Sequence, residues 1–238
     1  MGFALHNPTV MLYLFKSAVA LTGLHDALVP EPYRGRNKTI IGGFVRKRTF
    51  DVVFSAMIVV FLLSWLIPLI ALIIKSESKG PIFFKQLRTG KDGTPFHCLK
   101  FRSMTINDDA DVRQACKGDC RVTKVGHFLR KTSLDELPQF INVLKGEMSV
   151  VGPRPHMLLH TQEYSQVIDN FMERHTIMPG ITGLAQVCGH RGEIKALENM
   201  AQRVNVDLHY IHHWSFMLDL EIVVLTVWKL IQNDRKAY

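Results

Sequence analysis

Cysteine is scarce in this 238-residue chain, which contains only Cys98, Cys116, Cys120 and Cys188. Four thiols at these spacings do not make a disulfide framework for a chain of this length, so we expect reduced thiols and a fold that depends on its hydrophobic core. Cys116 and Cys120 lie near His127, but no fourth ligand follows at the spacing of a zinc site. The histidines also lack an HExxH spacing and predict no metal site.

Acidic residues are in deficit, with 21 Asp and Glu against 29 Lys and Arg and a formal net charge of +8. A basic balance suits nucleic acid, anionic lipid or phosphorylated substrates. The Trp and Tyr residues are not interleaved with basic ones and no nucleic-acid-binding motif occurs, so we expect no nucleic-acid partner. Repeats and low-complexity tracts are absent from residues 44–238, which favours one sizeable domain.

Charge is absent from Val52–Ile74, a run of 23 residues. As a helix this run would extend about 35 Å, which is enough to cross a bilayer. Basic residues flank it on both sides, at Arg46–Arg48 before it and at Lys75 and Lys79 after it. Because positive charge marks the cytoplasmic side of a membrane segment, we expect both ends on that side, as in a re-entrant helix. A straight single span is the alternative.

Pro68 supplies the expected breaking point of this helix. It removes the hydrogen bond to the carbonyl of Ser64, one turn earlier, and the Ser64 hydroxyl can satisfy backbone groups freed nearby. We therefore expect a membrane kink at Ser64 and Pro68, inside a re-entrant membrane helix at residues 46–79.

The two ends of the chain predict helices that lie in the membrane interface. Val10–Leu24 is moderately apolar, is interrupted by a lysine and a glycine, and lacks the cleavage pattern of a signal peptide. Residues 1–45 are therefore expected to form an interfacial and basic segment. Trp214–Ile231 is apolar but carries three charged residues, which favours a helix on the membrane surface over a span.

Asp135 and Glu136 form an acidic pair at the start of a predicted helix. Proline is tolerated only in the first helical turn, so Pro138 predicts a helix that begins near Asp135–Leu137 and stops at Gly146. Carboxylates at a helix N-terminus tend to stay ionised. Taken alone, such a pair is most often only a capping feature.

A cation follows the acidic pair on a stiff segment. Met148–Val151 predicts a buried strand, and Gly152–Pro155 then holds Arg154 between two prolines. Two anions beside a rigidly held cation indicate magnesium-assisted phosphate chemistry.

Two further segments carry charged candidates. Thr94–Met104 predicts a strand in which Lys100 and Arg102 share one face, although an exposed cationic edge is the alternative. Ile194–His212 has apolar residues at helical spacing, and Asp207 departs from that stripe. Together the elements predict an α+β fold with a single compact catalytic domain at residues 80–238.

The segment 130–155 resembles the signature of the bacterial sugar transferases, the monotopic phosphoglycosyl transferases that start glycan assembly on a polyprenyl phosphate. The resemblance continues in the family's order from about residue 44 to the end of the chain. It includes Lys100-Phe101-Arg102-Ser103-Met104, Pro179-Gly180-Ile181-Thr182-Gly183-Leu184-Ala185-Gln186-Val187, Asp207-Leu208-x-Tyr210 and Trp214-Ser215. One departure concerns the membrane kink, because family members commonly have Ser-Pro as adjacent residues whereas Trp65 follows Ser64 here.

The resemblance implies a role for each matched residue. Asp135 is the expected nucleophile, and Glu136 with Asp135 is the expected ligand of Mg²⁺ or Mn²⁺. The implied phosphate-binding cations are Lys100, Arg102, Arg130 and Arg154. The implied sugar-nucleotide contacts are Asp207 and Gln186.

The resemblance also implies a reaction: transfer of a hexose-1-phosphate from a UDP-sugar, with UDP-glucose or UDP-galactose favoured, to polyprenyl (undecaprenyl) phosphate through an aspartyl-phosphosugar intermediate. The expected location is the cytoplasmic face of the bacterial inner membrane, in contact with the lipid bilayer, and a homo-oligomer is compatible with it. A membrane-attached metal-dependent phosphohydrolase is the alternative enzyme, and an anionic-lipid-binding scaffold is the alternative without catalysis.

Overall fold

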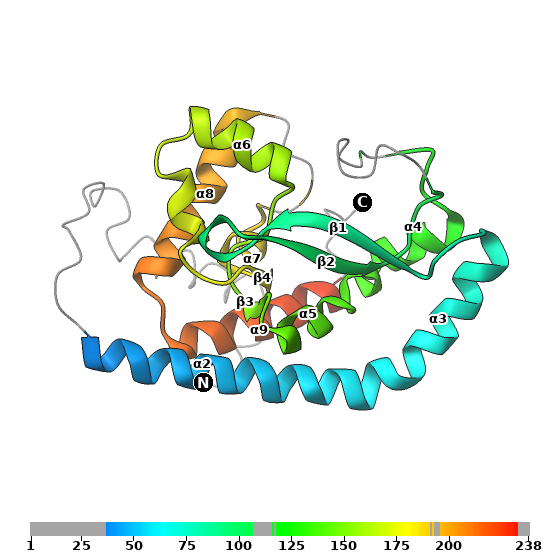
Figure 1. The fold of residues 1–238 in the computed structure, drawn as a ribbon, viewed down its shortest axis with the longest axis horizontal. Helices are drawn as coiled ribbons and strands as arrows, with labels where there is room; N and C mark the ends of the chain where they lie inside the picture. The colour runs from blue at the N-terminus through cyan, green and yellow to red at the C-terminus, as the bar shows by residue number, and fades with distance from the viewer. Residues whose placement is uncertain (1–36, 107–115, 117, 191, 193–195, 233–238) are drawn as a thin grey trace, which may run out of the picture. The chain divides into compact units, whose positions relative to one another are not determined.

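The structure is a computed structural model that describes residues 37–106, 116, 118–190, 192 and 196–232 (Figure 1). The chain divides into two units, Met1–Ile40 and Ile41–Tyr238. The long apolar segment and the acidic pair both belong to the second unit, so the segments 46–79 and 80–238 fall within one body. The interfacial helix predicted at Val10–Leu24 lies outside the described residues.

The described residues mix helices with short strands, as the sequence predicts. The helices are α2 (Asn37–Met57), α3 (Ser64–Glu77), α4 (Lys124–Lys131), α5 (Gln139–Lys145), α6 (Leu158–Val167), α7 (Leu184–Val187), α8 (Leu197–His212) and α9 (Phe216–Ile231). The strands are β1 (Phe83–Thr89), β2 (Pro95–Phe101), β3 (Ser149–Val151) and β4 (Gly180–Thr182).

The strands form two separate two-stranded sheets. Strands β1 and β2 make an antiparallel hairpin whose register runs from Phe83 opposite Phe101 to Thr89 opposite Pro95. Strands β3 and β4 are parallel, with Ser149 opposite Gly180. The predicted strands at Met148–Val151 and within Thr94–Met104 are therefore confirmed.

The apolar stripe of α8 packs into the core through its central turns. Met200 and Val204 are fully buried against Phe171, and Tyr164 and Leu208 flank this cluster. Asp207 lies on the same helix and is also buried. Acidic residues are rarely buried unless they are paired, so Asp207 is expected to have an internal partner.

A single helical path joins α2 to α3 through a π-helical segment, Ile58–Leu63, and Figure 1 shows the path bending in this region. In a π turn each N–H donates to a carbonyl one residue further back than in an α-helix. Here the Ser64 N–H donates to the Val59 carbonyl. The Val60 carbonyl instead accepts from the Ser64 hydroxyl at 2.6 Å, and Trp65 Nε1 donates to Phe61 O at 2.9 Å. The irregular segment thus directly precedes Ser64, whereas Pro68 lies inside α3.

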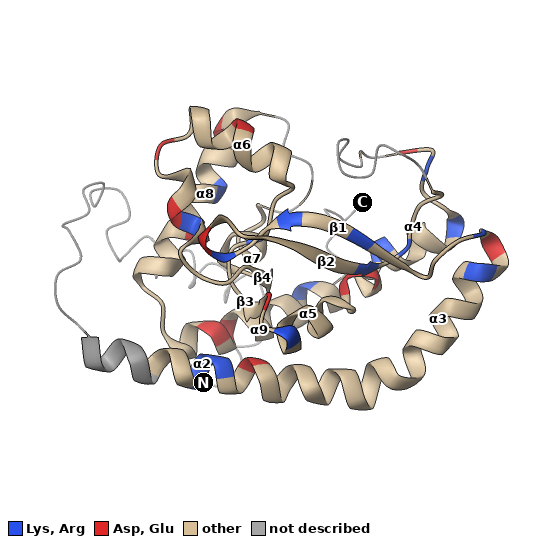
Figure 2. Ribbon diagram, in the orientation of Figure 1, with Lys and Arg blue, Asp and Glu red and all other residues tan. Residues whose placement is uncertain are grey.

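Among the described residues, the path Gly43–Glu77 is the one helix long and apolar enough to cross a membrane. Figure 2 shows its charged residues confined to the two ends. The large side chains that it exposes between those ends are Val52, Val53, Met57, Val60, Phe61, Trp65, Leu69, Leu72 and Ile73. Exposed apolar surface on this scale favours contact with lipid.

Candidate active site

The acidic pair occupies a short 3-10 turn, Leu134–Glu136, that precedes helix α5. The predicted helix start near Asp135 is therefore wrong by about one turn, although its predicted end at Gly146 is confirmed. Ser133 adopts a left-handed conformation with φ of 57°, and this turns the chain into the 3-10 segment. Pro138 then caps the start of α5 at Gln139.

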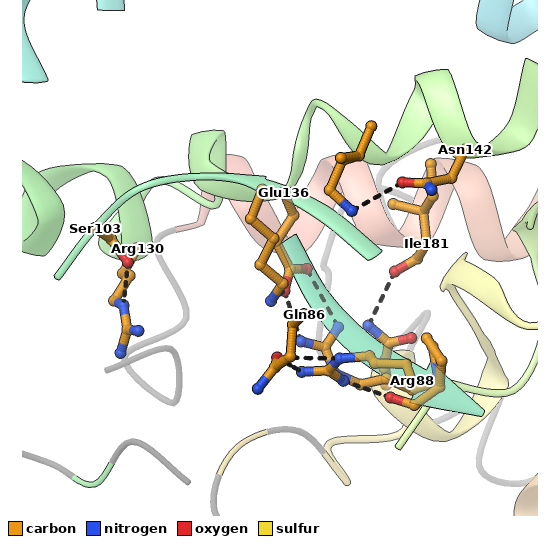
Figure 3. A network of polar contacts seen from close by, with 12 residues as sticks. Gln86, Arg88, Ser103, Arg130, Glu136, Asn142 and Ile181 are labelled. Carbon is orange, nitrogen blue, oxygen red and sulfur yellow. Dashed lines mark hydrogen bonds and ion pairs between the residues drawn. The ribbon is translucent and has the colours of Figure 1, made fainter. Parts of the chain in front are cut away.

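Glu136 is held by two cations. Lys100 Nζ lies 2.7 Å from Glu136 Oε1, and Arg154 Nη2 lies 2.6 Å from the same oxygen while Arg154 Nη1 lies 3.2 Å from Oε2 (Figure 3). Burial favours the protonated acid, but Arg154 and Lys100 outweigh it and hold the pKa of Glu136 well below its usual range. Glu136 in turn raises the pKa of Arg154. This side chain is therefore ionised at neutral pH.

Asp135 differs from its neighbour. The carboxyl is buried, and within the described residues it accepts no hydrogen bond. Burial raises its pKa to about 6, because the nearby charges of Lys100 and Arg130 only partly offset desolvation and repulsion by Glu136. Its oxygens are therefore uncommitted, which suits a nucleophile or a metal ligand.

The turn that carries Arg154 is tightly packed against β4. A Cβ on Gly152 would lie 2.5 Å from the Met178 carbonyl oxygen, and a Cβ on Gly183 would lie 2.3 Å from the Gly152 carbonyl oxygen. Only glycine allows backbones to approach this closely.

Three consecutive carbonyls of this turn are hydrogen-bonded. The Pro153 carbonyl accepts from Gly180 N at 2.9 Å, the Arg154 carbonyl accepts from Arg174 Nη2 at 3.0 Å, and the Pro155 carbonyl accepts from Arg88 Nη1. The stiff turn predicted around Arg154 is thereby explained. Proline is favoured at the first position of a helix, but because the residues of this turn are committed to these contacts, α6 begins at Leu158 and not at Pro155.

Arg88 is itself fixed in place from β1. Gln86 Oε1 accepts hydrogen bonds from Arg88 Nε at 3.2 Å and from Arg88 Nη2 at 2.6 Å, and Figure 3 shows the two side chains side by side near Glu136. From α5, buried Asn142 contacts the main chain of β2: it accepts from Leu99 N at 2.9 Å and donates to the His97 carbonyl at 2.8 Å. These contacts hold the backbone on either side of Asp135 and Glu136, the acidic dyad, and bring Lys100 to Glu136.

Asp207 pairs with Arg174 in a sealed site. The distance from Arg174 Nη2 to Asp207 Oδ2 is 2.6 Å, and Arg174 Nη1 also contacts His156 Nδ1. Burial and Arg174 lower the pKa of His156 well below its usual range, so this ring is neutral and can accept from the arginine. The structure therefore puts Asp207 on an internal partner, behind the Arg154 turn.

The remaining predicted residues lie in different surroundings. Arg130 Nε donates to Ser103 Oγ at 2.8 Å, to one side of Glu136 in Figure 3. Arg102 donates to the Lys79 and Ser78 carbonyls at 2.6 and 2.7 Å, so its guanidinium caps the end of α3 and does not join Lys100 on Glu136. Strand β2 ends at Phe101, which separates the two cations.

Gln186 lies on α7 and donates to the Ile181 carbonyl at 3.3 Å. Its Oε1 is buried and, among the described residues, has no hydrogen-bond donor. The structure brings Asp135, Glu136, Lys100 and Arg154 together, whereas the substrate contacts of Gln186 and Asp207 remain predictions.

Sequence reasoning missed the residues that support the site from behind. Arg174 lies in a 3-10 turn with no recognisable pattern around it, and nothing local marks Asn142 as other than a helix residue. Arg203 is also buried, and burial with the nearby Arg154 and Arg174 lowers its pKa to about 10. The one available signal was spacing, because Arg203 lies one helical turn before Asp207.

Comparison with known proteins identifies the family of this chain. The family model for bacterial sugar transferases matches residues 43–233. A UDP-glucose:undecaprenyl-phosphate glucose-1-phosphate transferase of Klebsiella pneumoniae is 54% identical over 195 residues, which cover 82% of this chain and 42% of the relative. Proteins of the same name from Escherichia coli (strain K12) and Caulobacter vibrioides are 50% and 49% identical, covering 93% and 80% of this chain and 46% and 71% of their own lengths.

This chain thus spans less than half the length of the Klebsiella and Escherichia relatives. The match nevertheless covers most of this chain, including the acidic pair, both sheets and the apolar helix. The chain belongs to the bacterial sugar transferase family.

Proposed function

We propose that this protein transfers a hexose-1-phosphate from a UDP-sugar to undecaprenyl phosphate, forming undecaprenyl-diphosphate hexose and UMP. UDP-glucose is the first candidate donor, because the relatives described above are named for it. UDP-galactose is the second candidate.

The observation that carries the proposal is the uncommitted carboxylate of Asp135 beside a locked, ionised Glu136. An oxygen of Asp135 attacks the β-phosphorus of the donor, the bond from that phosphorus to the bridging oxygen breaks, and UMP leaves with the electron pair. A phosphate oxygen of undecaprenyl phosphate then attacks the same phosphorus. The aspartyl–phosphorus bond breaks and the free Asp135 carboxylate returns.

Lys100 and Arg154 are the cations that stabilise the transferring phosphoryl group. Both lie on Glu136, and the Arg154 side chain retains 23% exposure, so a phosphate can reach it. Preorganised donors of this kind stabilise charge that develops in the transition state. Arg130 is close enough to lower the pKa of Asp135 and is the third candidate.

The dyad fits a divalent cation such as Mg²⁺ or Mn²⁺. Asp135 and Glu136 offer hard carboxylate oxygens, and no cluster of three or more such ligands occurs among the described residues. Mg²⁺ typically takes one or two carboxylates and completes its shell with water and substrate phosphates. When bound here, the ion would neutralise the donor diphosphate, and the low pKa of Glu136 suits a ligand better than a proton acceptor.

The apolar helix is proposed to enter and leave the membrane on the cytoplasmic side of the inner membrane. Its first end is tied to the domain by Lys47, which lies 2.7 Å from Asp219, and by Arg48, which donates to the Val143 carbonyl at 2.8 Å. At its other end, the Glu77 carboxylate accepts from Lys124 N and Val125 N at 2.7 and 2.9 Å.

A straight helix of 35 residues would be about 52 Å long and would separate its ends across a bilayer. Contacts of both ends with one folded unit favour the re-entrant path. Cysteines placed at Arg46 and at Lys79 should both resist a membrane-impermeant thiol reagent in intact cells, whereas labelling at one position alone would indicate a true span.

The test of function is UMP release by the full chain in nanodiscs with UDP-glucose, UDP-galactose and UDP-N-acetylglucosamine, each with and without undecaprenyl phosphate. We expect UMP release that requires the lipid phosphate and Mg²⁺ or Mn²⁺, and that is fastest with UDP-glucose. Release without the lipid would indicate a phosphohydrolase, and full activity after exhaustive EDTA treatment would contradict the metal requirement. Binding to anionic vesicles with no turnover of any donor would indicate that the protein is a lipid-binding scaffold and not an enzyme.

A further inference from the structure

Helix α2 contacts strand β3, which leads into the Arg154 turn, through two charged side chains. Lys47 Nζ donates to the Val151 carbonyl at 2.9 Å, and its ion pair with Asp219 is 2.7 Å long. One turn further along α2, Asp51 Oδ1 accepts from Val150 N at 3.0 Å. Two successive residues of β3 are therefore held by the helix that we propose lies in the membrane.

This connection is buried and its polar groups are matched. Asp219 is 0% exposed, Tyr210 is 1% exposed and Asp51 is 3% exposed. Tyr210 donates its hydroxyl hydrogen to Asp219 Oδ1 at 2.7 Å, and the same hydroxyl lies 3.3 Å from the Val151 carbonyl oxygen. Trp214 Nε1 donates to Asp219 Oδ2 at 3.0 Å. Buried charges are kept only where such partners are present, so the geometry is closely specified.

Strand β3 is short and buried, and α5 and α9 pack against it. It is three residues long, and in the described part of the chain its one strand partner is β4, itself three residues long. Val150 and Val151 run directly into Gly152–Pro155, and the side chain of Arg154 then reaches Glu136. The Lys47 contact at Val151 thus acts on the start of the segment that carries Arg154, whose carbonyls are also held by Gly180, Arg174 and Arg88.

We infer that Lys47 and Asp51 are positioning residues, through which the seating of α2 sets the place of Arg154 relative to Asp135 and Glu136. The assignment rests on the proposed phosphoryl transfer for its catalytic consequence. Neither residue contacts the dyad. Their effect on turnover passes through β3 and Arg154.

Lys47→Met tests the inference, because methionine keeps much of the apolar stem and removes the charge and the donors. Arg48→Met is the matched control: Arg48 is the next residue on α2 and also binds backbone carbonyls, but those of Val143 and Leu144 at the end of α5. Lys47→Arg is the conservative variant, which keeps a cation for Asp219.

The first measurement is amide hydrogen exchange of the full chain in nanodiscs and needs no substrate. We expect exchange at Val150, Val151, Gly152 and Arg154 to become about tenfold faster in Lys47→Met, with no such change in Arg48→Met. Equal changes in both variants, or faster exchange throughout the protein, would overturn the inference. Because this readout is independent of turnover, it stands even if the proposed function fails.

The second measurement is a double-mutant cycle on UMP release. We expect Lys47→Met to lower kcat by roughly 10- to 100-fold, since a small misplacement of a catalytic cation is costly, and Lys47→Arg to restore most of it. In an Arg154→Ala background the same substitution should have little further effect, because the group through which it acts is gone. Additive losses would show that Lys47 has only a general structural role.

Discussion

Two arginine–carboxylate pairs in this protein have the same length and different access to solvent. Arg154 lies 2.6 Å from Glu136, and Arg174 lies 2.6 Å from Asp207. The Arg154 side chain is 23% exposed, whereas that of Arg174 is 1% exposed. An accessible arginine can share its donors with an incoming phosphate, whereas a sealed one is confined to its internal partners.

The two pairs are connected in series. Arg174 donates to the main-chain carbonyl of Arg154, so the sealed pair holds the residue whose side chain forms the accessible pair. We therefore expect the same chemical group to serve positioning at one site and substrate contact at the other. The expected role of each pair depends on its burial and on the other contacts of its arginine, such as that of Arg174 with the Arg154 carbonyl.

Asp135→Asn gives the largest expected effect at the accessible site. It should lower turnover by at least about three orders of magnitude while the protein remains folded, because it removes the nucleophile and preserves its shape. UMP release by wild type and variant measures the loss. Asp92→Asn is the matched control, since Asp92 is an exposed aspartate of the β1–β2 turn with φ of 53°, a conformation that asparagine accepts.

Arg174→Met should mainly lower the stability of the protein, whereas Arg154→Met should mainly lower its turnover. Removing Arg174 leaves Asp207 buried without its cation, which should cost about 3–5 kcal/mol of stability. Removing Arg154 should change the melting temperature little but reduce turnover by about 10²–10³-fold. Melting curves and UMP release on the same preparations separate the two.

Similar stability losses in both arginine variants would abolish the distinction between an accessible and a sealed pair. Arg174→Lys provides a control in which a cation remains for Asp207 but the contacts with His156 and the Arg154 carbonyl are reduced. We expect it to retain more stability than Arg174→Met.

The accessible site was predictable from sequence because its parts are local. Asp135, Glu136 and Pro138 are consecutive or nearly so, and Arg154 follows between two prolines. Local steric rules therefore indicate a helix start and a stiff turn, although not the 3-10 segment that carries the dyad. The family resemblance added Lys100, which the chain brings to Glu136 from a distant strand.

The sealed site was not predictable in this way. Arg174 and Asp207 are far apart in the sequence, and a buried arginine has no local periodic pattern. Arg102 illustrates the same limit, because strand alternation placed it with Lys100 while the carbonyls at the end of α3 capture its guanidinium. The contact of Lys47 with Val151 likewise depends on tertiary packing.

Asp135→Asn should also stabilise the protein at neutral pH, in contrast to the loss expected for Arg174→Met. The pKa of Asp135 rises from 3.8 to about 6 on burial, which corresponds to ~3 kcal/mol against the ionised form. The native state then binds more protons than the unfolded state between these two values, so stability falls as the pH rises through this window. Melting temperatures should be higher for the variant at pH 7.5, with the difference vanishing near pH 4, and a lower value at pH 7.5 would contradict the assignment.

The pH dependence of turnover is the smallest effect and the finest test of the accessible site. A nucleophilic Asp135 must be ionised, and its pKa of about 6 predicts that kcat/KM for the UDP-sugar falls about tenfold for each pH unit below that value. Glu136 stays ionised throughout, because Arg154 and Lys100 hold its pKa low.

A cation bound by the dyad favours the ionised Asp135, so raising the Mg²⁺ concentration should move the acidic limb to lower pH. The measurement is a series of pH profiles at several Mg²⁺ concentrations, with melting curves at each pH to exclude unfolding. A limb that stays at one pH at every Mg²⁺ concentration would separate the titrating group from the metal site.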